Sequence, residues 1–108
     1  MMFVYFASPL MKGGVVFMTN IDKKIEKIGY KIRRINRRIN SIVYENIYQD
    51  QEITIEWGAD DQDCFIFSNT ITEQRDWYGQ LYKEPMGLTI NEIRLFMSKI
   101  QELRLEES

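Results

Sequence analysis

The chain contains no histidine and a single cysteine, Cys64, among its 108 residues. The absence of histidine excludes Ser-His-Asp and Cys-His catalysis and the usual zinc sites, and it removes the commonest general base near neutral pH. A lone cysteine excludes an intramolecular disulfide, so nothing in the sequence requires an oxidising compartment. The apolar stretch within residues 1–17 is too short to span a bilayer. We therefore expect a non-enzymatic cytoplasmic protein without membrane association, metal or cofactor.

Hydrophobic residues make up 44% of the chain and charged residues 28%, which is ordinary for one soluble domain. The charges are unevenly distributed along the sequence. Residues 21–42 carry eight basic and two acidic side chains, whereas residues 43–108 carry five basic and fourteen acidic ones. Either the basic segment pairs with the acidic body inside the fold, or the two form separate surfaces that bind different partners.

Residues 1–17 are expected to lie outside the domain. Lys12-Gly13-Gly14 can be encoded by a purine-rich run that resembles a ribosome-binding site, three codons before Met18. We hypothesise that translation starts at Met18 and that the earlier residues are an over-extended leader or a disordered extension, in a bacterial or phage gene. The alternative is a genuine strand over residues 2–6, which are rich in β-favouring side chains. Residues 18–108 are expected to form a single α+β domain.

Seven isoleucines are separated by steps that alternate between four and three residues. This spacing is typical of the a and d positions of a helix, and it predicts one buried apolar stripe. With Thr19 as the N-cap, the predicted helix runs to about Val43 or Tyr44, and Gly29 is the weak point in its middle. The seven residues are Ile21, Ile25, Ile28, Ile32, Ile35, Ile39 and Ile42.

The middle of the chain predicts a β-hairpin. Residues 52–57 alternate between apolar and polar side chains, as a half-buried strand does, and residues 64–67 are apolar on both faces, which predicts a strand deeper in the sheet. Residues 42–48 fit either a helix end or another strand. Residues 81–82 could add a short third strand, and the conformation of the rest of residues 69–87 is not predicted.

A second helix is predicted near the C-terminus. Thr89 and Glu92 form the pattern of a capping box, and the helix they start runs to about Leu105. Its predicted apolar face comprises Ile93, Phe96, Met97, Ile100 and Leu103. The predicted order is α-β-β-(β)-α, with a long N-terminal helix and a C-terminal helix packed on a short antiparallel sheet.

The sequence predicts binding of a macromolecular partner, most concretely by an inhibitor-like or immunity-like protein. Acidic and aromatic side chains would contact a basic surface of another protein, because Trp and Tyr are enriched in protein interfaces and electrostatics speed association. The three aspartates of residues 60–63 do not fit an EF-hand, since the required glycine and glutamate are missing. The candidate residues are Glu52, Glu56, Asp60, Asp61, Asp63, Trp77, Tyr78 and Tyr82.

Two alternatives remain open at the level of sequence. Lys27, Lys31, Arg34 and Arg38 would form one continuous line on the predicted helix, and such a line could follow a phosphate backbone in a nucleic-acid-associated protein of a phage or mobile element. The isoleucine stripe could instead join several copies in a coiled coil. The positions that flank the stripe carry three basic residues, Lys24, Lys31 and Arg38, but only one acidic residue to pair with them, Asp22, which favours a monomer.

Overall fold

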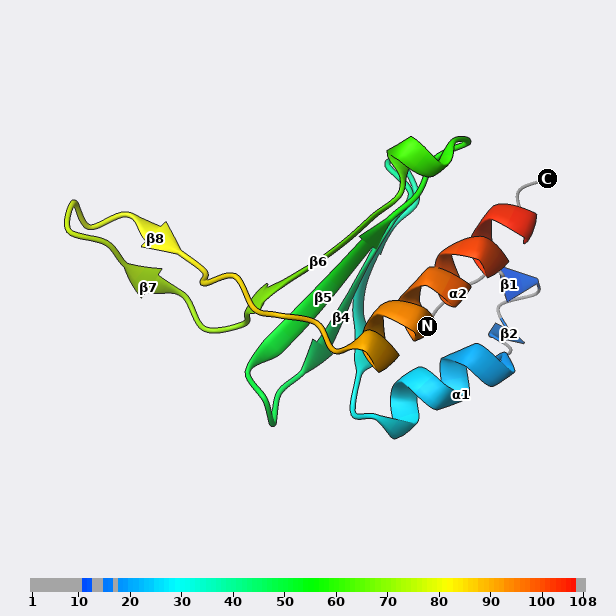
Figure 1. Cartoon of the computed structure of the whole chain (residues 1–108), viewed down its shortest axis with the longest axis horizontal. Coiled ribbons are helices and arrows are strands. Elements are labelled where there is room, and N and C mark those ends of the chain that lie inside the picture. The colour runs from blue at the N-terminus through cyan, green and yellow to red at the C-terminus, as the bar shows by residue number, and fades with distance from the viewer. Residues whose placement is uncertain (1–10, 13–14, 17, 107–108) are drawn as a thin grey trace.

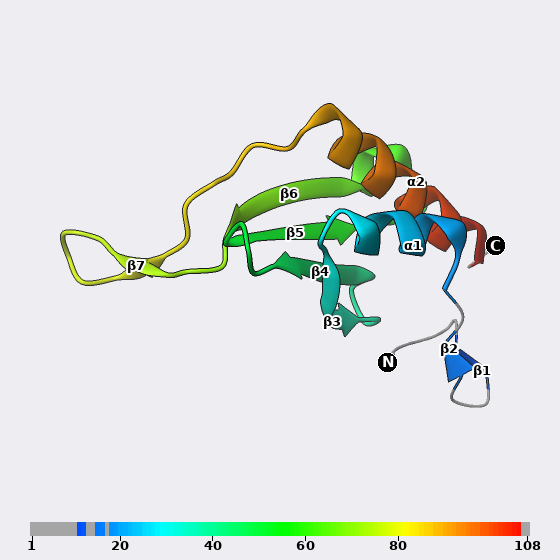
Figure 2. The same ribbon diagram turned by 90° about the horizontal axis from the view of Figure 1, so that it is seen from below.

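The computed structural model describes residues 11–12, 15–16 and 18–106. Its body is a four-stranded antiparallel sheet in the order β3-β4-β5-β6, so each strand pairs with its neighbour in sequence. Two helices, α1 (Asn20–Lys27) and α2 (Ile90–Glu106), lie on one face of this sheet (Figures 1 and 2). The strands are β3 (Lys31–Asn36), β4 (Ser41–Asn46), β5 (Gln51–Glu56) and β6 (Phe65–Thr70). The predicted α+β class is confirmed.

Two short hairpins accompany the body. One joins β1 (Met11–Lys12) to β2 (Val15–Val16), and the other joins β7 (Gln74–Arg75) to β8 (Leu81–Tyr82). A single 3-10 turn, η1 (Asp61–Asp63), lies between β5 and β6. Residues 81–82 therefore form a strand, but it pairs with β7 and not with the main sheet. The alternative strand over residues 2–6 lies outside the described residues.

The prediction of one long N-terminal helix is wrong. Helix α1 ends at Lys27, and the chain turns at Gly29, whose φ of +103° is a left-handed value that glycine adopts far more readily than other residues. A Cβ atom on Gly29 would lie 2.7 Å from the side-chain nitrogen of Asn46. The chain then forms the β3–β4 hairpin, where the prediction had a continuous helix.

A β-bulge in β3 explains why the isoleucine spacing suggested a helix. Ile32 lies opposite Tyr44 and Ile35 lies opposite Ile42, with a register shift between Ile32 and Arg34. Residues three apart point to opposite faces of a regular strand, but the extra residue of a bulge brings them to the same face. A bulged strand thus reproduces the three-residue step of a helical stripe.

The core lies between the sheet and the helices, and Phe96 of α2 is at its centre with no exposed surface. The rings of Tyr30 and Tyr44 pack edge-on against Phe96, with centroids 5.7 and 5.0 Å away. The core also contains Ile25, Ile42, Ile53, Ile55, Trp57, Ile100 and Leu103. The apolar face predicted for residues 52–57 is confirmed, but the strand is not half-buried, because Glu52 and Thr54 on its polar face are buried as well.

Strand β6 differs from its prediction. It is one of the two edge strands and does not lie deep in the sheet, and Phe65 and Phe67 keep 52% and 46% of their surface exposed. A strand that is apolar on both faces usually lies between two covered faces, but here both helices lie on one face of the sheet (Figure 1). Strand pairing places Phe67 beside Thr54 and Phe65 beside Glu56, on the other face.

Both predicted helix starts are confirmed. The Thr89 N–H donates to Glu92 Oε1 at 2.8 Å and the Glu92 N–H donates to Thr89 Oγ1 at 3.0 Å. The other oxygen of Glu92 accepts from the Tyr30 hydroxyl at 2.8 Å, so the cap is also tied to the start of the sheet. Thr19 caps α1 in the same reciprocal way with Asp22. The apolar face of α2 is confirmed only in part, since Ile93 and Met97 are exposed.

The two helices are joined by an ion cluster around the buried Lys99. Lys99 Nζ lies 2.8 Å from Asp22 Oδ1 and 3.0 Å from Glu102 Oε1, and the Thr19 hydroxyl donates to Glu102. Burial alone would lower the pKa of Lys99, but the two carboxylates outweigh it and raise that pKa. The cluster fixes α1 against α2 even though α1 has only eight residues.

The turn at Gly29 predicts a specific sensitivity to substitution. Gly29→Ala is expected to lower the free energy of unfolding by about 1–3 kcal/mol, because alanine is strained at this φ and its Cβ must displace Asn46. Gly87→Ala is the matched control, since a Cβ there meets no atom within 4 Å, and its effect should stay within about 0.5 kcal/mol. Urea unfolding measures both, and equal stability of the two variants would contradict the described turn.

Candidate functional site

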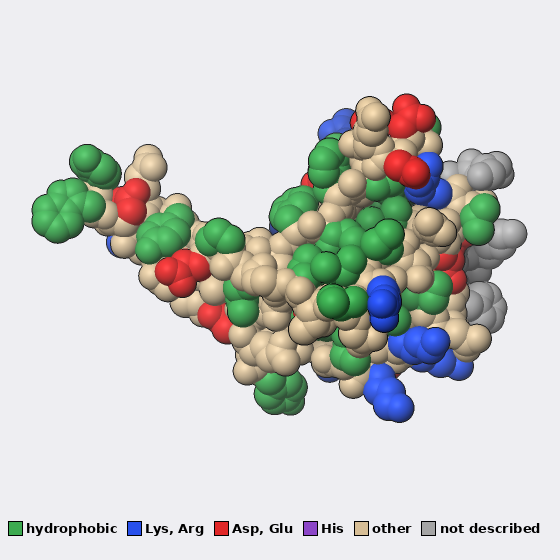
Figure 3. All heavy atoms as spheres, viewed as in Figure 1, with side chains coloured by type: hydrophobic (Ala, Val, Ile, Leu, Met, Phe, Trp, Pro, Cys, Tyr) green, Lys and Arg blue, Asp and Glu red, His purple; other side chains and the backbone are tan. Residues whose placement is uncertain are grey.

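Residues 71–83, here called the arm, form a hairpin that projects from the sheet (Figures 1 and 3). Within it Gln74 pairs with Tyr82 and Arg75 pairs with Leu81. Trp77 and Tyr78 at the tip keep 93% and 87% of their surface exposed. Aromatic side chains of this size are normally buried in a domain or an interface, so their exposure marks the tip as a candidate contact site.

The tip is a closed turn organised by Asp76. Its Oδ1 accepts from the backbone N–H groups of Tyr78 and Gln80, both at 2.8 Å. The Asp76 N–H donates to the Gln80 carbonyl and the Gly79 N–H donates to the Asp76 carbonyl. Gly79 has a φ of +81°, which this turn requires. Arg75 Nη1 donates to the Gly79 carbonyl at 2.7 Å. These bonds hold both aromatic residues on an ordered backbone.

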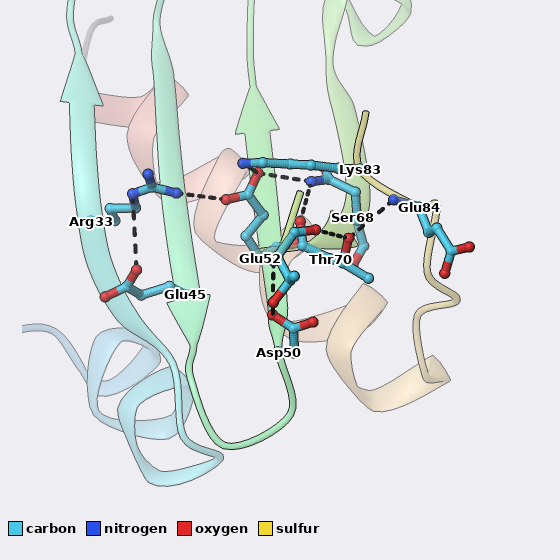
Figure 4. Close-up of polar contacts among 10 residues, drawn as sticks. Arg33, Glu45, Asp50, Glu52, Ser68, Thr70, Lys83 and Glu84 are labelled. Atoms are coloured by element: carbon cyan, nitrogen blue, oxygen red, sulfur yellow. Dashed lines mark hydrogen bonds and ion pairs between the residues drawn. The ribbon is translucent and has the colours of Figure 1, made fainter. Parts of the chain in front are cut away.

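The base of the arm is clamped to the sheet. The Thr70 N–H donates to the Glu84 carbonyl at 2.8 Å, and the Glu84 N–H donates to Thr70 Oγ1 at 3.0 Å (Figure 4). Asp50, in the β4–β5 turn, accepts from both the N–H and the hydroxyl of Thr72 through Oδ1. Met86 continues the clamp by donating its N–H to the Ser68 carbonyl. The chain therefore leaves and re-enters the sheet at one fixed place.

A charged network beside the clamp ties the arm to the sheet (Figure 4). Glu52, whose side chain is only 9% exposed, lies 2.8 Å from Arg33 Nη1 and 3.0 Å from Lys83 Nζ, and it accepts from Asn69 at 2.8 Å. Arg33 also approaches Glu45 at 3.9 Å. Burial alone would raise the pKa of Glu52, but the hydrogen bonds from Asn69 and Lys83 and the two positive charges lower it. Glu52 is thus held ionised.

The side chains that point away from the helices form the second face of the sheet, here called the open face. Its central residues Val43, Thr54 and Glu52 are buried, and Phe65 and Phe67 at its edge are half-exposed. Cross-strand pairing places Arg34, Val43, Thr54 and Phe67 in one row of this face. The bulge in β3 brings Arg33 to the same face, where it meets Glu52. The open face comprises Arg33, Arg34, Val43, Glu45, Glu52, Thr54, Glu56, Phe65, Phe67 and Asn69.

The structure does not bring the eight predicted partner-binding residues together. Asp60, Asp61 and Asp63 lie before the start of β6, whereas the arm follows its end, so the acidic turn and the aromatic tip are at opposite ends of this strand (Figure 1). Asp61 is paired with Arg104 at 2.6 Å. Of the other predicted residues, Glu52 and Glu56 lie on the open face, and Trp77, Tyr78 and Tyr82 lie on the arm.

The predicted basic line is not formed either. Lys27 ends α1, Lys31 and Arg34 lie on β3, and Arg38 lies in the β3–β4 turn, where its N–H donates to Asn36. The isoleucine stripe is divided in the same way among α1, β3, the following turn and β4, and Ile39 in the turn is 60% exposed. Nucleic-acid binding along one helix and a coiled coil through one seam therefore both lose the structural element on which they depend.

Among the exposed apolar residues that the sequence reasoning missed, four lie beside the arm or on the open face. Ile47 and Tyr48, exposed by 67% and 93%, lie in the β4–β5 turn whose Asp50 contacts the arm. Phe65 and Phe67 lie on the open face. The exposure of Ile47 and Tyr48 could have been predicted from the sequence. They lie between Asn46 and Asp50, and Asn and Asp favour turns, where apolar side chains are seldom buried. Asn46 does accept from the N–H groups of Tyr48 and Gln49.

Comparisons with known proteins give no assignment. No family model matches the chain, and no curated protein and no solved structure matches it. In the part of the chain that the structure describes, no helix has the length and apolar character needed to cross a membrane. Within the same residues, no group of three or more cysteine, aspartate and glutamate side chains is arranged to hold a metal ion.

The role of Asp76 can be tested by two substitutions. Asp76→Ala removes the oxygen that accepts from Tyr78 and Gln80, so the exchange of these two amide hydrogens should accelerate by roughly tenfold, the effect of losing about 1–2 kcal/mol of local order. Asp76→Asn retains an acceptor oxygen and should stay close to the parent chain. Hydrogen exchange followed by NMR measures both rates. Unchanged rates in Asp76→Ala would show that the tip is not organised by this side chain.

The lowered pKa of Glu52 predicts a pH dependence of stability. Ionised Glu52 stabilises the folded chain above its unfolded pKa of about 4.3, and this contribution is lost as the pH falls through the lower folded-state pKa. Glu52→Gln should therefore cost about 1–3 kcal/mol at pH 7 and progressively less below about pH 4. Thr54→Val, on the same face, should shift stability equally at every pH. Urea titrations give both curves, and a constant difference for Glu52→Gln would refute the assignment.

Proposed function

We propose that this chain is a non-enzymatic, inhibitor-like or immunity-like protein that inserts the tip of the arm into a concave site on another protein. The observation that carries the proposal is the pair Trp77 and Tyr78, almost fully exposed on a turn that the hydrogen bonds of Asp76 close. A projecting apolar tip fits a cleft and not a flat surface. Trp and Tyr are also the residues that most often dominate interface energies.

The order of the arm supports this proposal energetically. Binding by a mobile loop costs conformational entropy for each residue that becomes fixed, whereas a pre-formed hairpin has already met that cost during folding. Asp76 fixes the tip, and the contacts of Asp50 and Glu52 fix the base. The binding energy of the two aromatic side chains is therefore available for affinity.

The arm also indicates the chemistry of the partner site. The cleft should be apolar at its floor to receive Trp77 and Tyr78. The exposed carboxylates of Glu73 and Glu84 flank the two strands of the arm, so a basic rim would complement them. This retains the basic partner expected from the sequence but transfers the contact from the acidic turn at residues 60–63 to the arm.

Site-specific photo-crosslinking tests the proposal. A photoreactive phenylalanine derivative placed at position 77 should trap one defined protein in lysate of the native host, identified by mass spectrometry. The same group at position 48, which is equally exposed but lies on the β4–β5 turn, is the matched control and should not trap it. With the purified pair, Trp77→Ala should weaken binding by about 2–4 kcal/mol.

The outcomes separate clearly. Equal trapping from positions 77 and 48, or an affinity that is unaffected by Trp77→Ala, would refute insertion of the arm tip.

A further inference from the structure

Strand β6 has an outer edge that the chain covers only in part. The segment that follows the arm lies along its last residues, where the Thr70 N–H donates to the Glu84 carbonyl and the Met86 N–H donates to the Ser68 carbonyl. This cover ends at Ser68. Residues 65–67, here called the free edge, have no neighbouring strand on their outer side among the residues that the structure describes.

The free edge presents the backbone groups of one residue, Ile66. In an antiparallel sheet, successive residues direct their N–H and C=O groups alternately to one neighbour and to the other. Ser68 and Thr70 direct theirs away from β5, since they bond the segment after the arm. Ile66 lies two residues earlier, so its N–H and C=O point outward as well. Within the described part of the chain no hydrogen bond to these two groups is found.

The two edges of the sheet differ in how they resist the addition of another strand. Edge strands are normally protected by charged side chains, by a bulge or by a covering segment. The other edge strand, β3, has a bulge and the exposed basic side chains of Lys31 and Arg34. The free edge has neither, and its Phe65 and Phe67 are 52% and 46% exposed. Of the two edges, β6 is therefore the one open to a further strand.

Helix α2 adds an apolar strip beside the free edge. Arg104 of α2 donates to Asp61 in the turn before β6, so this side of the helix faces that strand. Ile93 and Met97 precede Arg104 by eleven and seven residues, which places all three on one side of the helix. Ile93 and Met97 are 36% and 51% exposed. Apolar side chains lie on the surface between β6 and α2 (Figure 3).

The free edge has acidic groups at both ends. Asp60 and Asp63 are exposed in the turn before β6, where Asp61 is already paired with Arg104. At the other end, the exposed Glu84 is bonded to the backbone beside it. An extended chain with basic residues on both sides of a short apolar centre complements this pattern. A second copy does not, because antiparallel pairing of two β6 strands brings the acidic turn of each against the acidic end of the other.

We propose that the free edge binds an extended segment of another protein, apolar at its centre and basic at both ends, which adds to the sheet as a fifth strand. Its central residue pairs with Ile66 and directs its side chain toward Ile93 and Met97, because residues opposite each other in a sheet point to the same face. Its two neighbours lie beside Phe65 and Phe67. In this mode of recognition, main-chain bonds supply affinity and alternate side chains supply specificity. The site is separate from the tip of the arm, so the inference does not rest on the proposed function.

A synthetic peptide tests the inference with the full chain. Fluorescein-labelled Lys-Lys-Val-Leu-Val-Lys-Lys should bind saturably in a titration followed by fluorescence anisotropy. N-methylation of its leucine removes the N–H that donates to the Ile66 carbonyl, so binding should weaken about tenfold, the effect of one lost hydrogen bond. The peptide Glu-Glu-Val-Leu-Val-Glu-Glu should bind at least about tenfold more weakly, because its ends have the wrong charge. Equal binding of either control peptide would overturn the inference.

Two substitutions on α2 test where the peptide lies. Met97→Lys removes an apolar contact and adds a positive charge beside a basic peptide, so it should weaken binding about tenfold. Leu105→Lys makes the same change at a 75% exposed position of the same helix, outside the apolar strip, and should alter binding by no more than about twofold. Equal effects of the two substitutions would contradict the proposed position.

Amide hydrogen exchange locates the added strand. In the saturated complex the Ile66 amide should exchange at least about tenfold more slowly than in the free chain, because its N–H becomes bonded. The amides of β3 should be unaffected. Protection on β3, or none at Ile66, would overturn the inference. Protection of Ile66 that rises with protein concentration in the absence of peptide would show that a second copy occupies the edge, which would also overturn it.

These outcomes are distinguishable from those of the photo-crosslinking test. The peptide has no cleft to receive Trp77, so its binding reports on the free edge alone. A chain that binds no peptide but traps a protein from position 77 refutes strand addition and leaves the proposed function standing. Peptide binding with protection of Ile66, but no trapping from position 77, supports strand addition and refutes insertion of the arm tip.

Discussion

The chain leaves the main sheet at Thr70 and rejoins it at Glu84, and reciprocal hydrogen bonds hold these two residues together. Both ends of residues 71–83 are thus held at one point on the edge of the sheet. The segment between them can pair its own strands by forming a hairpin that projects from this point. The pairing of β7 with β8 and the Asp76 turn complete that hairpin. The exposure of the aromatic tip follows from this clamp, and the proposed function follows from the exposure. The same clamp ends at Ser68, which leaves the free edge of β6 uncovered.

The fold could be predicted from sequence wherever local chemistry and periodicity agreed. The N-cap at Thr19, the capping box at Thr89 and the alternation of residues 52–57 indicated elements that the structure confirms. The isoleucine spacing misled because a bulged strand and a helix can both place residues three apart on one face. Gly29 was recognisable as a weak point, but its left-handed φ follows from its approach to Asn46, a contact across seventeen residues of chain.

The candidate site was only partly predictable for a related reason. Aromatic composition drew attention to residues 77–82, which lie on the arm, but the sequence does not show that the acidic turn lies at the other end of β6. Nor does it show that the segregated charges are partly matched inside the fold, through Arg33 with Glu52 and through Lys99 with Asp22. These pairings join residues far apart in the chain, so they depend on strand register and helix packing, which local patterns do not specify.

The central claim is that the arm is an ordered element held away from the body, and a distance measurement tests it most directly. Spin labels can be placed on cysteines at positions 78 and 60 in a Cys64→Ser background, diluted with unlabelled protein so that only pairs within one chain contribute. Double electron–electron resonance should give a single, narrow distribution of long distances between the two labels. A broad distribution, or one dominated by short distances from an arm folded onto the sheet, would contradict the account.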